Sequence, residues 1–249
     1  MKIARQQIVI VFEIDKLIVL TCGMAIKNAQ KELGGQVLTT NVPDDAPPSM
    51  PRIILKLEDT VMSLGLDRIQ LSTIPPSHVS GDLKKASEYT LKRAAPFFSE
   101  LLPNISKYIW AGVITELRFY ESPMKSKSAN EMVAPLFDKL LNIDREKKEL
   151  ASFQIQYGFK EDQYFKNYTI SGFEDRKIEL NMPPKGESVV VDLNEHPLTG
   201  CGVMVLLDTN NKPNRHNDDP IRDVESLLEK QELLTPNLVQ DISLEEVLK

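Results

Sequence analysis

Three short apolar segments with very short connections constrain the fold more than any other part of the sequence. They are Arg52–Leu57, Val61–Leu66 and Arg68–Ile74, and the acidic and glycine residues between them are typical of turns. Parallel strands need a crossover of about a dozen residues or more, which is longer than either connection here. The segments therefore predict an antiparallel meander.

Other segments extend this expectation along the chain. Phe153–Phe159 alternates apolar and polar side chains, as a half-buried strand does. Further strands are expected in β-branched or aromatic runs at Ile8–Ile14, Val113–Tyr120, Tyr164–Ser171, Lys177–Met182, Ser188–Leu193 and Gly202–Asp208. Helical spacing and capping residues predict helices over about Lys16–Leu33, Asp82–Leu102 with a kink or break at Pro96, Ser128–Asn142, and Asp219–Glu232. The alternative for the first of these is a hairpin through Asp15 and Lys16, with a shorter helix after Cys22.

A polar stretch, residues 121–128, divides these elements into two groups that each contain strands and helices. We therefore expect an α+β protein with two antiparallel-sheet halves, each packed with helices. The expected domains are residues 1–122 and 128–249. Residues 95–105 resemble residues 134–143, which leaves open a duplicated unit or two amphipathic helices of similar composition.

The composition is that of an ordinary soluble globular protein. The 249 residues are 41% hydrophobic and 27% charged, and the formal net charge of −6 argues against a dedicated nucleic-acid-binding protein. Acidic residues interrupt the N-terminal apolar segment before it reaches the roughly 18 residues of a membrane span, so no membrane association is expected. The two distant cysteines, Cys22 and Cys201, suit a reducing compartment, and we expect a cytoplasmic protein.

Residues 187–220 contain the best candidates for a chemical site. Two short apolar runs there each end in an aspartate and lead into a polar loop with a histidine. The candidate metal ligands are Asp192, His196, Asp208 and His216, because carboxylate and imidazole groups bind metal ions. Their spacing matches no established metal-binding motif, and turn residues with a helix start at Asp219 explain most of this segment structurally.

No other motif specifies a reaction or a cofactor. The glycine pairs do not extend to a phosphate-binding pattern, and Cys201 opens an apolar strand, which favours packing over nucleophilic catalysis. Aromatic residues near Trp110 and between Tyr157 and Tyr168 fit either sheet packing or an interface.

The leading hypothesis for function is a non-enzymatic binding or accessory subunit that acts through protein–protein contacts, with a protein partner or a second copy and without a cofactor. Absence of catalytic signatures is its main support. The alternatives are a metal-dependent hydrolase or nuclease with its site in residues 187–220, and a small-molecule-binding module.

Overall fold

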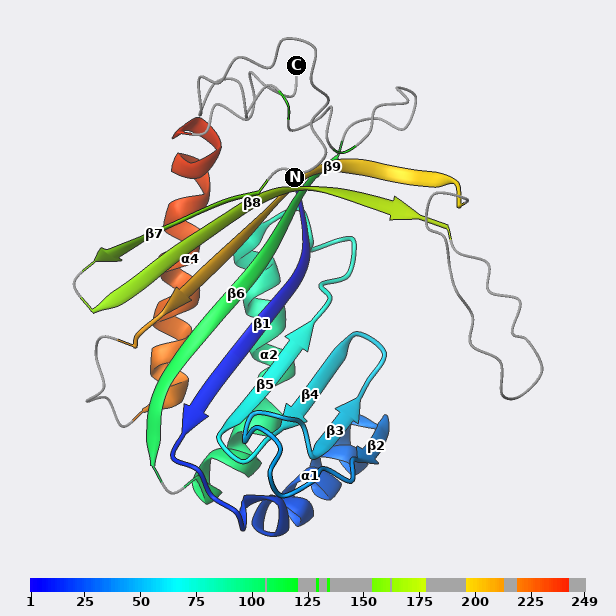
Figure 1. The fold of residues 1–249 in the computed structure, drawn as a ribbon, viewed down its shortest axis with the longest axis vertical. Coiled ribbons are helices and arrows are strands. Elements are labelled where there is room, and N and C mark those ends of the chain that lie inside the picture. Colours follow the sequence, from blue (N-terminus) through cyan, green and yellow to red (C-terminus); the bar gives the residue numbers. More distant parts are fainter. Residues whose placement is uncertain are drawn as a thin grey trace.

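The computed structural model describes residues 1–105, 107–120, 129, 134, 154–161, 163–177, 196–212 and 219–241. Within these residues, nine strands form one antiparallel sheet in the order β2-β3-β4-β5-β1-β6-β9-β8-β7 (Figure 1). The strands are β1 (Lys2–Phe12), β2 (Gln36–Thr39), β3 (Ile53–Lys56), β4 (Thr60–Leu64), β5 (Arg68–Thr73), β6 (Tyr108–Tyr120), β7 (Gln154–Glu161), β8 (Tyr164–Arg176) and β9 (Leu198–Asn210). The helices are α1 (Ile18–Leu33), α2 (Leu83–Leu101), the short 3-10 helix η1 (Leu102–Asn104) and α4 (Pro220–Asp241). The predicted combination of helices with an antiparallel sheet is confirmed.

The predicted meander is present as β3, β4 and β5. The register places Leu55 opposite Met62 and Met62 opposite Leu71, so one row of buried side chains crosses all three strands. β2 is an addition that the sequence did not predict. It has only four residues, is largely exposed, and follows directly after Gly34 and Gly35. In the sequence, these two glycines indicate only the end of a helix.

β6 and β9 join the strands of the two predicted halves into a single sheet. Their register runs without a break from Gly112 opposite Asn210 to Tyr120 opposite Gly202. The expectation of two separate sheet halves is therefore not confirmed, because the two groups of strands are neighbours in one sheet. The predicted boundary at residues 121–128 lies outside the described residues, as do the strand at Ser188–Leu193 and residues 178–182 of another.

The helices α1, α2 and α4 pack on one face of the sheet, and α2 and α4 lie behind the strands in Figure 1. α2 begins at Asp82, whose carboxylate accepts a hydrogen bond from the N–H of Lys85, and it continues through Pro96 as one helix rather than two. α4 begins after Asp219, which caps it through the N–H groups of Ile221 and Arg222. Of the helix predicted from Ser128, the structure describes only residues 129 and 134, and both are helical.

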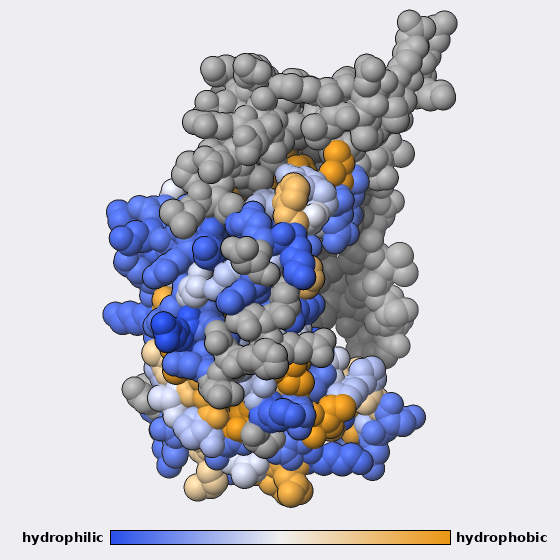
Figure 2. Space-filling view, turned by 90° about the vertical axis from the view of Figure 1, so that its left-hand side faces the viewer, coloured by the Kyte–Doolittle hydropathy of each residue, from blue (hydrophilic) through white to orange (hydrophobic). Residues whose placement is uncertain are grey.

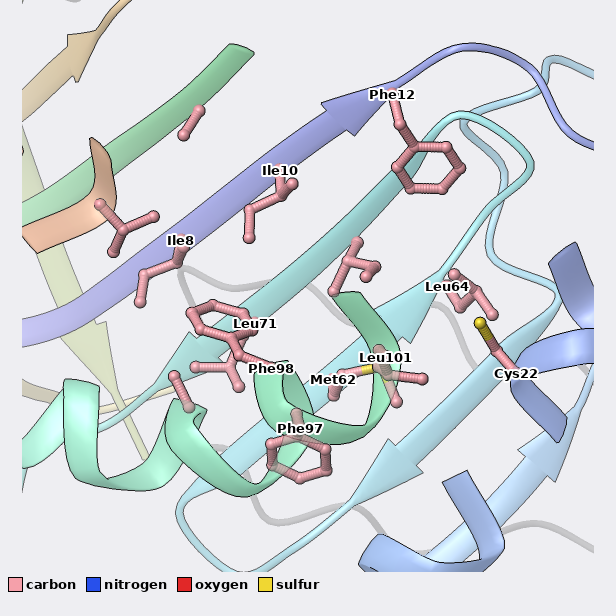
Figure 3. Packing of buried hydrophobic residues seen from close by; sticks show 14 of the residues in the cluster. Ile8, Ile10, Phe12, Cys22, Met62, Leu64, Leu71, Phe97, Phe98 and Leu101 are labelled. Carbon is pink, nitrogen blue, oxygen red and sulfur yellow. The ribbon is translucent and has the colours of Figure 1, made fainter. Parts of the chain in front are cut away.

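The main hydrophobic core fills the space between the sheet and the helices. Figure 3 shows side chains from β1, β4 and β5 directed toward α2, with Cys22 of α1 at the margin of the same cluster. Its central members are Ile8, Ile10, Phe12, Met62, Leu64, Leu71, Phe97, Phe98 and Leu101. No helix among the described residues is long and apolar enough to cross a membrane.

A buried chain of polar side chains also lies between the sheet and the helices. The amide of Gln6, which is 0% exposed, donates to the hydroxyls of Ser87 and Thr115 and accepts from Thr90. The hydroxyl of Thr115 in turn donates to the side chain of Gln231 on α4 at 2.6 Å. Because an unpaired buried polar group costs about 1–3 kcal/mol, these contacts fix α2 and α4 on the sheet.

Candidate interaction surface

α1 has two different faces, and only one of them enters the core. The buried face repeats at helical spacing and consists of Ile18, Cys22, Ala25 and Ile26. On the other side, Leu17 at the N-cap, Leu20 and Met24 are 65%, 77% and 69% exposed. Single exposed leucines are common, but three large apolar side chains on one side of a helix form a patch. We call Leu17, Leu20 and Met24 the α1 stripe.

β2 lies beside α1 at one edge of the sheet (Figure 1). β3 pairs with it on one side, and no described strand pairs with it on the other. The N–H of Thr40 donates to the carbonyl of Arg52 at 2.9 Å. Because antiparallel ladders alternate between bonded and non-bonded pairs, the main-chain N–H and C=O groups of Val37 and Thr39 point away from β3 toward the free edge.

The two edges of the sheet differ in their protection against pairing. Natural edge strands commonly carry lysine, proline or a bulge that prevents another strand from adding. The sequence of β2, Gln-Val-Leu-Thr, has none of these, and its protection is its short length. β7, at the other edge, includes Lys160 and Glu161. β2 is therefore the more receptive edge.

A groove of about 490 Å³ opens where the first turn of α1 meets the end of β2 and the proline-rich loop after it. Val19 and Leu20 line it from α1, Thr39 lines it from β2, and Arg52 lines it from the start of β3. Leu20 thus belongs to both the groove and the α1 stripe. On the face drawn in Figure 2, hydrophobic side chains gather mainly toward the lower part of the molecule.

Three exposed lysines lie at the α1 end of the molecule, Lys27 and Lys31 on α1 and Lys16 just before it. Lys16, Lys27 and Lys31 are exposed, and none of them forms an ion pair with another described residue. Lys16 also lines the groove, together with Arg52 and one acidic residue, Asp44. The α1 end therefore presents exposed lysines that no described acidic residue pairs with, although the whole chain carries a net charge of −6.

Cys22 has no reactive character despite its place on the same helix. Burial, together with the negative charge of Asp15, raises the pKa of its thiol to about 11. The thiol is therefore protonated at neutral pH, and the thiolate form that acts as a nucleophile is scarce. Cys201 is also a buried thiol, in keeping with the packing role favoured from the sequence.

A second polar cluster lies beneath a smaller cavity of about 410 Å³ that Tyr108 lines. The hydroxyl of Tyr108 donates to the carboxylate of Asp223 at 2.7 Å, and the side-chain amide of Asn211 donates to the same oxygen at 2.5 Å. Burial and the hydrogen bond to Asp223 raise the pKa of Tyr108 well above its ordinary value of 10. The phenol therefore stays protonated, which suits a structural donor and not a general base.

A third cluster connects the β3–β4 turn to α2. Asp59 accepts hydrogen bonds from the hydroxyl of Tyr89 and from the guanidinium of Arg93, whose closest nitrogen lies 2.8 Å away. Burial acts to raise the pKa of Asp59, but these hydrogen bonds hold it below 3.8. The carboxylate is ionised and its acceptor sites are occupied, so this cluster ties the sheet to α2.

The residues predicted as metal ligands are only partly described. Asp192 and His216 lie outside the described residues. His196 precedes β9 and accepts a main-chain hydrogen bond from Arg176, whereas Asp208 lies near the far end of β9 and accepts from Asn167. His196 lies two residues before the start of β9 and Asp208 lies two residues before its end, so the structure places them toward opposite ends of this strand.

Two narrower pairings of the predicted ligands stay as predictions, Asp192 with His196 and Asp208 with His216. Each pair has one member that the structure does not describe. Among the described residues, no group of three or more His, Cys, Asp or Glu side chains is arranged to hold a metal ion.

The aromatic residues divide between packing and exposure. Tyr157 stacks on Tyr168 with ring centroids 5.0 Å apart, and Phe159 contacts both rings while remaining 54% exposed. The ring of Trp110 lies under the ammonium group of Lys212, at 4.3 Å from the ring centroid. These contacts are of the kind that a sheet forms between its own side chains.

No known protein-family model and no curated protein matches this chain. Sequence reasoning missed the α1 stripe because Leu17, Leu20 and Met24 read as ordinary members of an apolar helix. The signal was present, since apolar residues surround more of this helix than one buried face needs.

Proposed function

We propose that the chain is a protein-binding module, a non-enzymatic accessory subunit whose contact surface is the end of the molecule formed by α1 and β2. The α1 stripe is the observation that carries this proposal, because its three side chains are at least 65% exposed beside a groove and a free strand edge. Covering apolar surface contributes about 25 cal/mol per Å², so a partner that buries the stripe gains stability.

The polar clusters support structural roles, which fits a binding protein. Asp59 is held by Tyr89 and Arg93, and Asp223 is held by Tyr108 and Asn211. In the proposed function these contacts keep the sheet and helices fixed while the exposed end binds. The two buried thiols support the expected reducing, cytoplasmic setting.

Small-molecule binding is the second candidate, and the cavity above Tyr108 favours it. Its volume of about 410 Å³ falls within the range of roughly 300–1,000 Å³ typical of ligand sites. Lys107 and Asp219 line the cavity beside the apolar Leu102 and Ile221, which gives a site with both charged and apolar walls. A Tyr108→Ala variant that loses binding of a small molecule identified by native mass spectrometry would support this alternative.

Photo-cross-linking of the full chain in its native host tests the main proposal. Benzoylphenylalanine replaces Leu20 in one variant and Gln156, an exposed residue of β7, in the control. We expect the probe at Leu20 to give a discrete cross-linked species that disappears when Met24→Asp is added. Equal cross-linking from both positions, or none from position 20, would contradict the proposal.

A further inference from the structure

We propose that the partner binds as an extended strand that adds to the free edge of β2, with apolar side chains directed toward the groove and acidic side chains near the lysines of α1. This inference rests on the proposed function and names the chemistry of the partner. It follows from three features of the same end of the molecule: the free edge, the groove and the positive charge.

The backbone of β2 sets the geometry of the added strand. The free N–H and C=O groups of Val37 and Thr39 provide two donors and two acceptors along the edge. Side chains that lie opposite each other on paired strands share one face of the sheet. Because Thr39 lines the groove and Val37 packs against the core, the partner residues opposite them lie on the helix side.

The groove determines which side chains the partner places there. Leu20 and Val19 form an apolar wall beside Thr39. A valine, leucine or isoleucine opposite Thr39 would cover Leu20, and a second apolar residue two positions away would lie opposite Val37. The recognised segment therefore has two apolar residues separated by one residue of less restricted type.

The charge at this end favours a partner of opposite sign over a second copy of the chain. Pairing two copies through β2 would bring Lys16, Lys27 and Lys31 of one copy toward the same residues of the other. Like charges brought together oppose association, whereas acidic side chains flanking the apolar pair complement these lysines. A lipid surface would meet the lysines but would leave the free groups of Val37 and Thr39 without a ladder partner.

Titration calorimetry with a defined peptide tests the inference. The probe is a blocked peptide of about ten residues, with valines at alternate central positions, threonines between them and aspartates at both ends. In a second peptide, every other central amide carries an N-methyl group, and in a third peptide the remaining central amides carry it. A fourth peptide has lysines in place of the terminal aspartates. The variants are Val37→Pro, which removes a donor only from the free edge, and Leu20→Asp.

The acidic peptide is expected to bind the wild-type chain, and binding should weaken more than about tenfold with Val37→Pro, with Leu20→Asp and with lysine ends. Only one of the two N-methyl sets should abolish binding, because only alternate amides face β2. This last comparison uses unaltered protein, so it holds even if Val37→Pro fails to fold.

Several results would overturn strand addition. The first is that no peptide binds the chain up to about 1 mM, and the second is that peptides with either N-methyl set bind equally well. The third is that the chain binds phosphatidylserine vesicles instead of the peptide, and the fourth is that it forms a dimer that Leu20→Asp dissociates. If cross-links from position 20 to another protein persist alongside the first or second result, the proposed function stands and only the mode of binding fails. If those cross-links are also absent, both fail.

Discussion

The hydroxyl of Thr115 donates a hydrogen bond to the side-chain carbonyl of Gln231 at 2.6 Å. Thr115 lies on β6 and Gln231 on α4, and both are 0% exposed. The amide nitrogen of Gln231 also donates to the main-chain carbonyls of Val113 on β6 and Leu207 on β9. One side chain from α4 therefore spans the junction at which the strands of the two predicted halves meet.

Gln231→Leu is expected to lower the free energy of unfolding by about 2–4 kcal/mol, because it removes hydrogen-bond partners from buried groups on two strands. Urea denaturation followed by circular dichroism measures the change. Gln156→Leu, at an exposed position on β7, is the matched control and should change stability by no more than about 0.5 kcal/mol. Equal losses in the two variants would show that the buried network does not hold α4.

Asp59→Asn should change how stability depends on pH. Hydrogen bonds from Tyr89 and Arg93 hold the pKa of Asp59 in the folded chain below its ordinary value of 3.8. The stabilisation is therefore complete above that value and is lost as the pH falls through the folded pKa. We expect the stability difference between wild type and variant to be constant from about pH 5 to 7 and to shrink below about pH 4.

Thermal melts across this pH range provide the measurement for Asp59. Asp45→Asn, in the exposed loop after β2, serves as the control. A difference between wild type and Asp59→Asn that persists unchanged at about pH 3 would mean that the carboxylate does not contribute through its charge.

Tyr108 should remain protonated in alkaline solution while the chain stays folded. Burial and the hydrogen bond to Asp223 raise its pKa well above the ordinary value of 10. Ultraviolet absorbance titration reports tyrosine ionisation, and Tyr108→Phe should remove one of the groups that ionise late. Loss of a tyrosine that ionises near pH 10 would instead place the Tyr108 hydroxyl in water.

Both cysteines should resist modification in the native state. The pKa of Cys22 is raised to about 11, and Cys201 is buried on β9. Reaction with a disulfide reagent at neutral pH is expected to be slow until the chain is unfolded, when both thiols react. Rapid modification of Cys22 in the folded chain would show that α1 separates from the core.

Much of the fold could be predicted because its local patterns agree with its tertiary environment. The spacing of Arg52–Leu57, Val61–Leu66 and Arg68–Ile74 permits only hairpin connections, and Asp219 caps a helix as expected. The union of both groups of strands was not predictable. It depends on pairing between β6 and β9, which are distant in sequence, and no local pattern states which strands become neighbours.

The candidate surface was harder to predict than the fold. The sequence pattern favours a site in residues 187–220, where acidic residues and histidines follow apolar runs. The proposed contact surface instead lies on α1 and β2. Leu20 and Cys22 are both compatible with an apolar helix, yet one is 77% exposed and the other is 0% exposed. Which face of the helix is buried and which is exposed depends on how α1 packs against β3 and α2.

Hydrogen–deuterium exchange of the chain alone and in complex with the protein captured by cross-linking shows directly whether α1 and β2 form the contact surface. We expect the complex to slow exchange in α1 and β2, with no comparable change in β7 at the opposite edge of the sheet. Slower exchange confined to β7 or to the cavity above Tyr108, with α1 and β2 unchanged, would contradict this contact surface.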